Sequence, residues 1–134
     1  MNSKVKHSII AGIIATAFMS ILAAGIADML ASFMHIPLAM GWVLHFMVGI
    51  ILSFIFFFFF LGKLPGNLII QGVLYSLIPF IVAQMIMMPM MDMGIFSSKT
   101  EAPLMNVMGS LGAHIIYGLV LGLYAKYIAN RFFS

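Results

Sequence analysis

The sequence contains no cysteine and almost no charge. The absence of cysteine from all 134 residues excludes disulfide bonds, thiolate metal sites and cysteine nucleophiles. Only 7% of the residues are charged, whereas charged residues make up about a quarter of an ordinary soluble domain. The six basic and three acidic residues are too few and too scattered to form a nucleic-acid-binding surface. We therefore expect no nucleic-acid partner.

The motifs of common enzyme classes are missing as well. The sequence has no glycine-rich phosphate loop, no HExxH zinc helix and no nucleophile elbow. Its apolar segments also lack the series of charged residues that proton pumps and ion transporters use. We expect that the protein is not an autonomous enzyme, apart from redox chemistry at a bound cofactor.

Apolar residues make up 64% of the chain, and they are gathered into long segments. A soluble fold of this size could not bury so much apolar surface, because small domains leave much of their surface exposed. Four segments reach the length of about 20 apolar residues that a transmembrane helix needs: 8–34, 41–61, 67–91 and 104–124. The sequence predicts an all-α bundle of four transmembrane helices, forming one domain over residues 1–134 in a lipid bilayer.

The distribution of basic residues predicts the orientation. In a four-span arrangement one side of the membrane holds Lys4, Lys6, Lys63, Lys126 and Arg131. The other side holds Lys99 alone. Cytoplasmic loops of membrane proteins carry the excess of lysine and arginine. We therefore expect both termini to lie on the cytoplasmic side of a bacterial inner membrane.

The second and fourth segments share a pattern. A small residue, a histidine and a glycine recur at a spacing of four, as Gly41, His45 and Gly49 and as Ser110, His114 and Gly118. This spacing places each set on one helix face. The first and third segments match more weakly, at Gly12 with Gly72. The pattern predicts two helix hairpins related by a pseudo-two-fold axis along the membrane normal, with both histidines at one depth in the outer half of the bilayer.

His45 and His114 are the main candidates for a binding site. Ionisable side chains inside a span are costly and usually face the bundle interior with a partner. Two histidines on facing helices fit the axial ligands of a haem b, with Gly49 and Gly118 leaving room for the macrocycle, or the ligands of a copper ion. The alternative is structural: each histidine forms an interhelical hydrogen bond, and the glycines allow close packing.

The sequence is rich in methionine, and the distribution is one-sided. Of its 14 methionines, all but Met1 and Met19 map to the outer half or the outer loops. Thioethers are soft ligands that select Cu(I). We therefore add Met88 and Met91 as candidate copper ligands, and Asp28 as a ligand or as a group that orients a ligating histidine. Packing is the alternative role for each methionine, because its flexible side chain fills irregular apolar gaps.

Two further interpretations compete with the cofactor site. The protein could be an accessory subunit that packs against a larger membrane protein, or a homo-oligomer, through its glycine-rich and phenylalanine-rich faces. It could also provide a permeation route for copper or a small solute along the pseudo-two-fold axis. The sequence leaves these interpretations open.

Three motifs carry a resemblance to a known family. They lie in residues 41–49, 88–96 and 112–118. The chain resembles an uncharacterised family of small four-span bacterial inner-membrane proteins. In that family a tryptophan-containing HxxxG span, an MPxMxxGxF segment and a final HxxYG span occur in this order. The resemblance covers nearly the whole chain and implies the four-span fold. It places His45, Gly49, His114 and Gly118 among the recurring positions, and it implies no function.

Overall fold

The protein is helical throughout the part of the chain that the structure describes. The computed structural model describes the backbone of residues 1–132 and the side chains of residues 1–129, and this part contains no strand. The helices are α1 (Ser3–Met19), α2 (Ile26–Met34), α3 (Leu38–Ile55), α4 (Leu68–Val82), α5 (Met88–Met90) and α6 (Pro103–Phe132). Wider π-helical turns, η1 (Phe56–Phe60) and η2 (Ala83–Met87), continue α3 and α4, and a short 3-10 turn, η3 (Ile95–Ser97), precedes α6. The predicted all-α class is confirmed for these residues.

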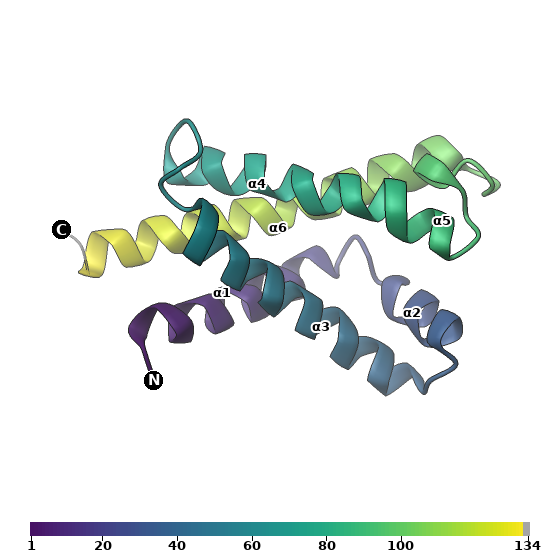
Figure 1. Ribbon diagram of the computed structural model, residues 1–134, viewed down its shortest axis with the longest axis horizontal. Helices are drawn as coiled ribbons and strands as arrows, with labels where there is room; N and C mark the ends of the chain where they lie inside the picture. Colours follow the sequence, from purple (N-terminus) through teal and green to yellow (C-terminus); the bar gives the residue numbers. More distant parts are fainter. Residues whose placement is uncertain (133–134) are drawn as a thin grey trace.

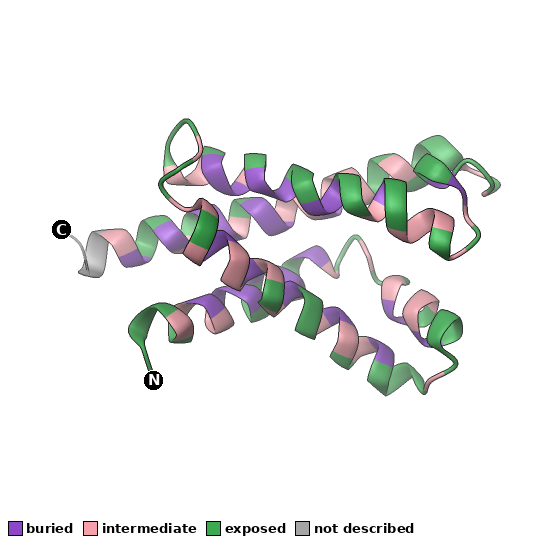
Figure 2. Ribbon diagram, viewed as in Figure 1, coloured by how far each residue is buried: buried purple, intermediate pink, exposed green. Residues whose placement is uncertain are grey.

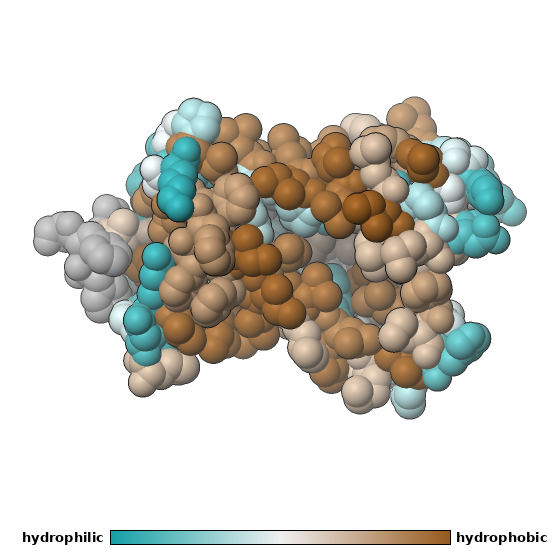
Figure 3. Space-filling view, in the orientation of Figure 1, coloured by the Kyte–Doolittle hydropathy of each residue, from teal (hydrophilic) through white to brown (hydrophobic). Residues whose placement is uncertain are grey.

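Three helical stretches of the described chain are long and apolar enough to cross a membrane: Leu38–Phe60, Leu68–Met90 and Pro103–Ala129. They correspond to the second, third and fourth predicted segments. The large apolar side chains on their outward faces are exposed, and polar residues gather at the two ends of the molecule (Figures 2 and 3). A bilayer provides the solvent that such faces need.

The first predicted segment, 8–34, differs from expectation because the structure divides it between α1 and α2. The Ser20 hydroxyl donates to the Thr16 carbonyl at 2.6 Å, a local bond of the kind that bends helices. The chain then turns before α2, which begins after Gly25 and packs against α3. Together α1 and α2 carry the chain from one end of the molecule to the other (Figure 1).

The two ends of the molecule differ in what they contain. The N-terminus, the last turns of α6 and the connection between α3 and α4 lie at one end, and α2, α5 and η3 lie at the other (Figure 1). We call the end that contains Lys4 and Lys63 the inner end, and the end that contains His35 and Asp92 the outer end. In Figure 1, α3 and α4 diverge toward the outer end.

Helices α1 and α3 pack through small residues. A Cβ atom added to Gly12 would lie 2.7 Å from the Cα atom of Ile50, so the two backbones approach too closely for any side chain there. One turn further along, the side chain of Thr16 lies directly on Gly49. Close contact of this kind is a main source of helix association in lipid.

Helices α4 and α6 pack through contacts of the same form. A Cβ atom added to Gly72 would lie 2.7 Å from the backbone nitrogen of Gly122, and it would also meet the carbonyl oxygen of Gly118. One turn further along, Ser76 lies on Gly118, as Thr16 lies on Gly49. Each pair of helices is therefore fixed in register by contacts between small residues.

The hydrophobic core fills the inner half, where the two helix pairs meet. Its largest buried side chains are Phe56, Phe57, Tyr75 and Tyr117. The Tyr75 hydroxyl donates to the carbonyl of Leu52 at 2.7 Å, and the Tyr117 hydroxyl donates to the carbonyl of Gly49. Because both bonds end on α3, they join α4 and α6 to the first helix pair.

We predict that Gly118→Ala destabilises the protein by about 1–3 kcal/mol, because the added methyl group would lie 2.7 Å from the Ser76 side chain and against the Gly72 carbonyl. Thermal unfolding in detergent measures the effect. Gly109→Ala is the matched control in the same helix, since no atom lies within 4 Å of the added carbon. Equal unfolding temperatures for the two variants would contradict the packing described for α4 and α6.

Candidate functional site

His45 and His114 occupy matching places in the two helix pairs. Each lies one turn to the outer side of its packing glycine, Gly49 on α3 or Gly118 on α6. The His45 side chain is buried, with 7% of its surface exposed, and His114 is half-buried. The two predicted histidines thus lie at the same level relative to the packing contact of each helix pair.

A hydrogen bond to Ser20 fixes the tautomer of His45. Its Nε2 atom lies 3.0 Å from the Ser20 hydroxyl oxygen. That hydroxyl already donates its one proton to the carbonyl of Thr16, so it accepts from the histidine. In the neutral imidazole the proton is therefore on Nε2, and Nδ1 keeps a free lone pair.

A backbone carbonyl fixes the opposite tautomer in His114. Its Nδ1 atom lies 2.7 Å from the carbonyl oxygen of Ser110, which can only accept. Neutral His114 therefore carries its proton on Nδ1, and Nε2 keeps a free lone pair. A histidine that ligates a metal usually donates its other ring N–H to such a carbonyl, which orients the ring.

Aromatic rings lie beside both histidines. Trp42 and Phe46 each lie 6.0 Å from His45, measured between ring centroids, and Phe80 lies 5.8 Å from His114. These contacts are edge-on, as is common for aromatic pairs. Within the described residues, no group of three or more His, Cys, Asp or Glu side chains lies together as a metal site. The pair therefore offers two imidazole ligands without a carboxylate.

The two glycines assigned to cofactor binding are covered by neighbouring helices. The side chain of Thr16 lies over Gly49, and Ser76 and the Gly72 backbone lie over Gly118. Protein atoms therefore fill the space beside each glycine. The sequence predicts room for a macrocycle at these positions, and the structure leaves none beside Gly49 or Gly118. Their observed role is close packing of helices.

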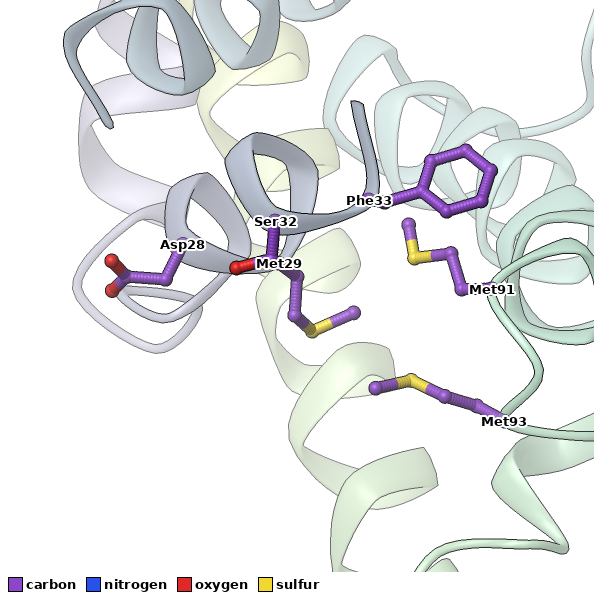
Figure 4. Close-up of a pocket in the computed structure, with 6 residues that line it drawn as sticks. All are labelled: Asp28, Met29, Ser32, Phe33, Met91 and Met93. Atoms are coloured by element: carbon purple, nitrogen blue, oxygen red, sulfur yellow. The ribbon is translucent and has the colours of Figure 1, made fainter. Parts of the chain in front are cut away.

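The remaining predicted ligands lie apart from the histidines. Asp28 and Met91 line a pocket at the outer end, of which neither histidine is a lining residue. In Figure 4 the Asp28 carboxylate points away from the methionine side chains of that pocket. Met88 begins α5 and is half-buried, but it is not among the residues that line this pocket.

Three residues of these sites were not identified from the sequence. Ser20 could have been found from its position, because it continues the four-residue spacing of Gly12 and Thr16 along α1. Met29 and Met93 line the pocket with Met91, but no pattern in the sequence distinguishes them from the other outer methionines. Their place depends on the fold.

Residues 29–129 match the model of a family described as "Protein of unknown function (DUF2938)". The chain belongs to this family. The matched region contains both histidines and Met91, whereas α1, with Thr16 and Ser20, precedes it. No curated protein and no solved structure matches the chain. This match confirms the prediction from the sequence that the chain belongs to an uncharacterised family.

The two tautomers can be tested directly. We predict that ¹⁵N spectra of the imidazoles at neutral or higher pH show a proton on Nε2 of His45 and on Nδ1 of His114, as their acceptors require. Ser20→Ala removes the acceptor for His45, and we expect the two tautomers of His45 to become mixed while His114 is unchanged. Identical His45 spectra with and without Ser20 would contradict this assignment.

Proposed function

We propose that the protein binds a copper ion between His45 and His114, in the outer half of the bilayer. The proposal depends on one observation: the imidazoles at matching places in the two helix pairs each keep one unprotonated nitrogen, because the other nitrogen is held by a hydrogen bond. A neutral imidazole is a common metal ligand, and both hydrogen-bond partners act as supports of the kind that metal sites use.

The hydrogen bonds favour copper over haem. A haem with two histidine ligands is normally held through Nε2 of both rings, and in His45 this atom is bonded to Ser20. The space beside Gly49 that a macrocycle would need is filled by Thr16. A single ion requires only the free atoms, Nδ1 of His45 and Nε2 of His114.

The ligand set also favours copper over zinc. Structural zinc sites are almost always tetrahedral with four protein ligands, and catalytic zinc sites have three. Two imidazoles without a carboxylate or thiolate are a poor match for either. Cu(I) has a filled d shell and tolerates low coordination numbers, and imidazole is one of the ligands that suit copper.

We further propose that the two helix pairs are copies of one hairpin, related by a pseudo-two-fold axis, and that the chain crosses the membrane four times. The matching contacts of Thr16 on Gly49 and of Ser76 on Gly118 support the repeat. Helix α1, at 17 residues, is about 26 Å long, close to the hydrocarbon thickness of about 30 Å, and the turn and α2 complete the crossing. Both termini then lie in the cytoplasm of a bacterial cell.

The topology can be tested by labelling, because the chain has no native cysteine. We predict that a membrane-impermeant maleimide labels Ala39→Cys and Ser98→Cys in intact spheroplasts. Ser3→Cys and Pro65→Cys should be labelled only after the membrane is opened. Ser3 decides the number of crossings, because with three spans it would lie outside with Ala39. Labelling of Ser3→Cys in intact spheroplasts would therefore exclude the four-span arrangement.

The copper site can be tested by metal analysis of the purified protein. We predict about one copper per chain at the histidine pair, lost when His45→Ala is combined with His114→Ala. His35→Asn is the matched control, since it removes an exposed imidazole and leaves a residue that tolerates the left-handed backbone of that position. Unchanged copper in the double variant would contradict the site, and a Soret band would indicate haem. Metal-free protein that co-purifies with a larger membrane complex would instead support an accessory role.

A further inference from the structure

A pocket of about 440 Å³ lies at the outer end, between α2 and the segment that follows α5 (Figure 4). Its lining residues are Asp28, Met29, Ser32 and Phe33 from α2, and Met91 and Met93 from the following segment. The pocket is separate from the histidine pair. In this pocket, methionines from two distant parts of the chain line the same cavity.

The three methionine side chains extend into this pocket from different directions. Figure 4 shows the side chain of Met29 reaching out from α2, and those of Met91 and Met93 reaching toward it from the opposite wall. All three thioether groups therefore border the same space. Carboxylate and hydroxyl oxygens are also present in the lining, but the Asp28 carboxylate points away from the sulfur atoms.

The backbone around Met91 and Met93 forms a defined turn. Asp92, between them, has a left-handed conformation with φ of 61°, and the chain changes direction there after α5. Hydrogen bonds hold Met93 on both sides: its N–H donates to the carbonyl of Met88, and its carbonyl accepts from the N–H of Lys99, each at 2.9 Å. The positions of the two thioethers are thus built into an ordered turn.

These three methionines differ from other outer methionines in their surroundings. Met85, Met90, Met105 and Met108 are exposed on the surface of the helices, at 48% to 75% of their area. Met29, Met91 and Met93 are half-buried, yet they border an open pocket where a core filler would be surrounded by other side chains. Their arrangement leaves room for a bound ion.

The charge at this end suits a cation. Asp28, Asp92 and Glu101 lie at the outer end, and Lys99 is the basic residue among them, paired with Asp92 at 3.2 Å. The remaining acidic charge attracts cations toward the pocket. Thioethers then select among them, because sulfur ligands prefer soft ions such as Cu(I), and oxygen ligands prefer calcium and magnesium.

We infer that Met29, Met91 and Met93 form a thioether site for Cu(I) at the outer end of the protein. The site deepens the proposed copper function, on which it rests for the physiological identity of the metal, by adding a first binding position outside the histidine pair. Binding involves no change of oxidation state, and the thioethers release no proton.

The test uses full-length protein in detergent, titrated with Cu(I) under reducing conditions against a competing Cu(I) chelator. The site variant combines Met29→Leu, Met91→Leu and Met93→Leu, because leucine keeps the apolar volume and removes the sulfur. The matched control combines Met90→Leu, Met105→Leu and Met108→Leu, which removes three exposed thioethers from the same end. Circular dichroism and thermal unfolding establish that both variants are folded.

We expect the site variant to weaken Cu(I) binding at this site by at least about 100-fold, because loss of residues that merely support a metal ligand already costs about 10–100-fold. The control should bind as the native protein does. X-ray absorption at the copper edge should show sulfur neighbours in the native protein and the control, and none in the site variant. Sulfur neighbours that persist in the site variant, or their absence from the native protein, would overturn the inference.

The same spectra separate this inference from the proposed function. The combined His45→Ala and His114→Ala variant should keep the sulfur neighbours and lose the nitrogen neighbours. If the nitrogen neighbours persist in that variant while the site variant loses sulfur, the histidine site fails and the thioether site stands. If sulfur persists in the site variant while nitrogen is lost in the histidine variant, the thioether site fails and the histidine site stands.

Discussion

The arrangement of this protein depends on the direct contact of helix backbones at small residues. In lipid, apolar side chains gain little from leaving their surroundings, so helices associate through close packing and hydrogen bonds. Gly12 on α1 and Gly72 on α4 allow this approach, and Thr16 and Ser76 then cover the facing glycines of α3 and α6. These contacts fix the register of each helix pair, and the register places a histidine one turn beyond each contact. The positions of His45 and His114 therefore follow from the packing.

The second constraint is that buried polar groups in a bilayer need partners within the protein. Carbonyl oxygens of α3 accept from Tyr75 and Tyr117, which joins the two helix pairs while satisfying both hydroxyls. The Ser20 hydroxyl donates its proton to the carbonyl of Thr16, so its oxygen is left to accept a hydrogen bond from His45. Among the described side chains, the Thr16 hydroxyl is buried without a partner, lying on Gly49.

The sequence predicted the features that repeat along the chain. Long apolar segments predicted the helices of α3, α4 and α6, and the four-residue spacing placed His45 and His114 one turn from Gly49 and Gly118, the glycines that pack against neighbouring helices. The break between α1 and α2 was not predicted, because residues 21–24 are apolar and compatible with a helix. The methionine pocket was also beyond prediction, since it depends on the left-handed backbone of Asp92 and on the approach of α2 to a segment about 60 residues away in the chain. Neither the hydropathy of the sequence nor the spacing of its residues indicates the break between α1 and α2 or the methionine pocket.

The two proposed sites differ in chemistry in a way that suits successive binding of one ion. Thioethers at the outer end are neutral, soft ligands that hold Cu(I) without competing protons, whereas imidazoles bind more strongly as their nitrogens deprotonate. Beyond the histidines, Phe56, Phe57, Tyr75 and Tyr117 fill the inner half, and the two tyrosine hydroxyls are bonded to α3. An ion bound at the histidines in this conformation would meet a closed core on the side of the inner end. Passage of the ion through the protein would require those tyrosine hydrogen bonds to break, so under the proposed function this conformation would retain the ion.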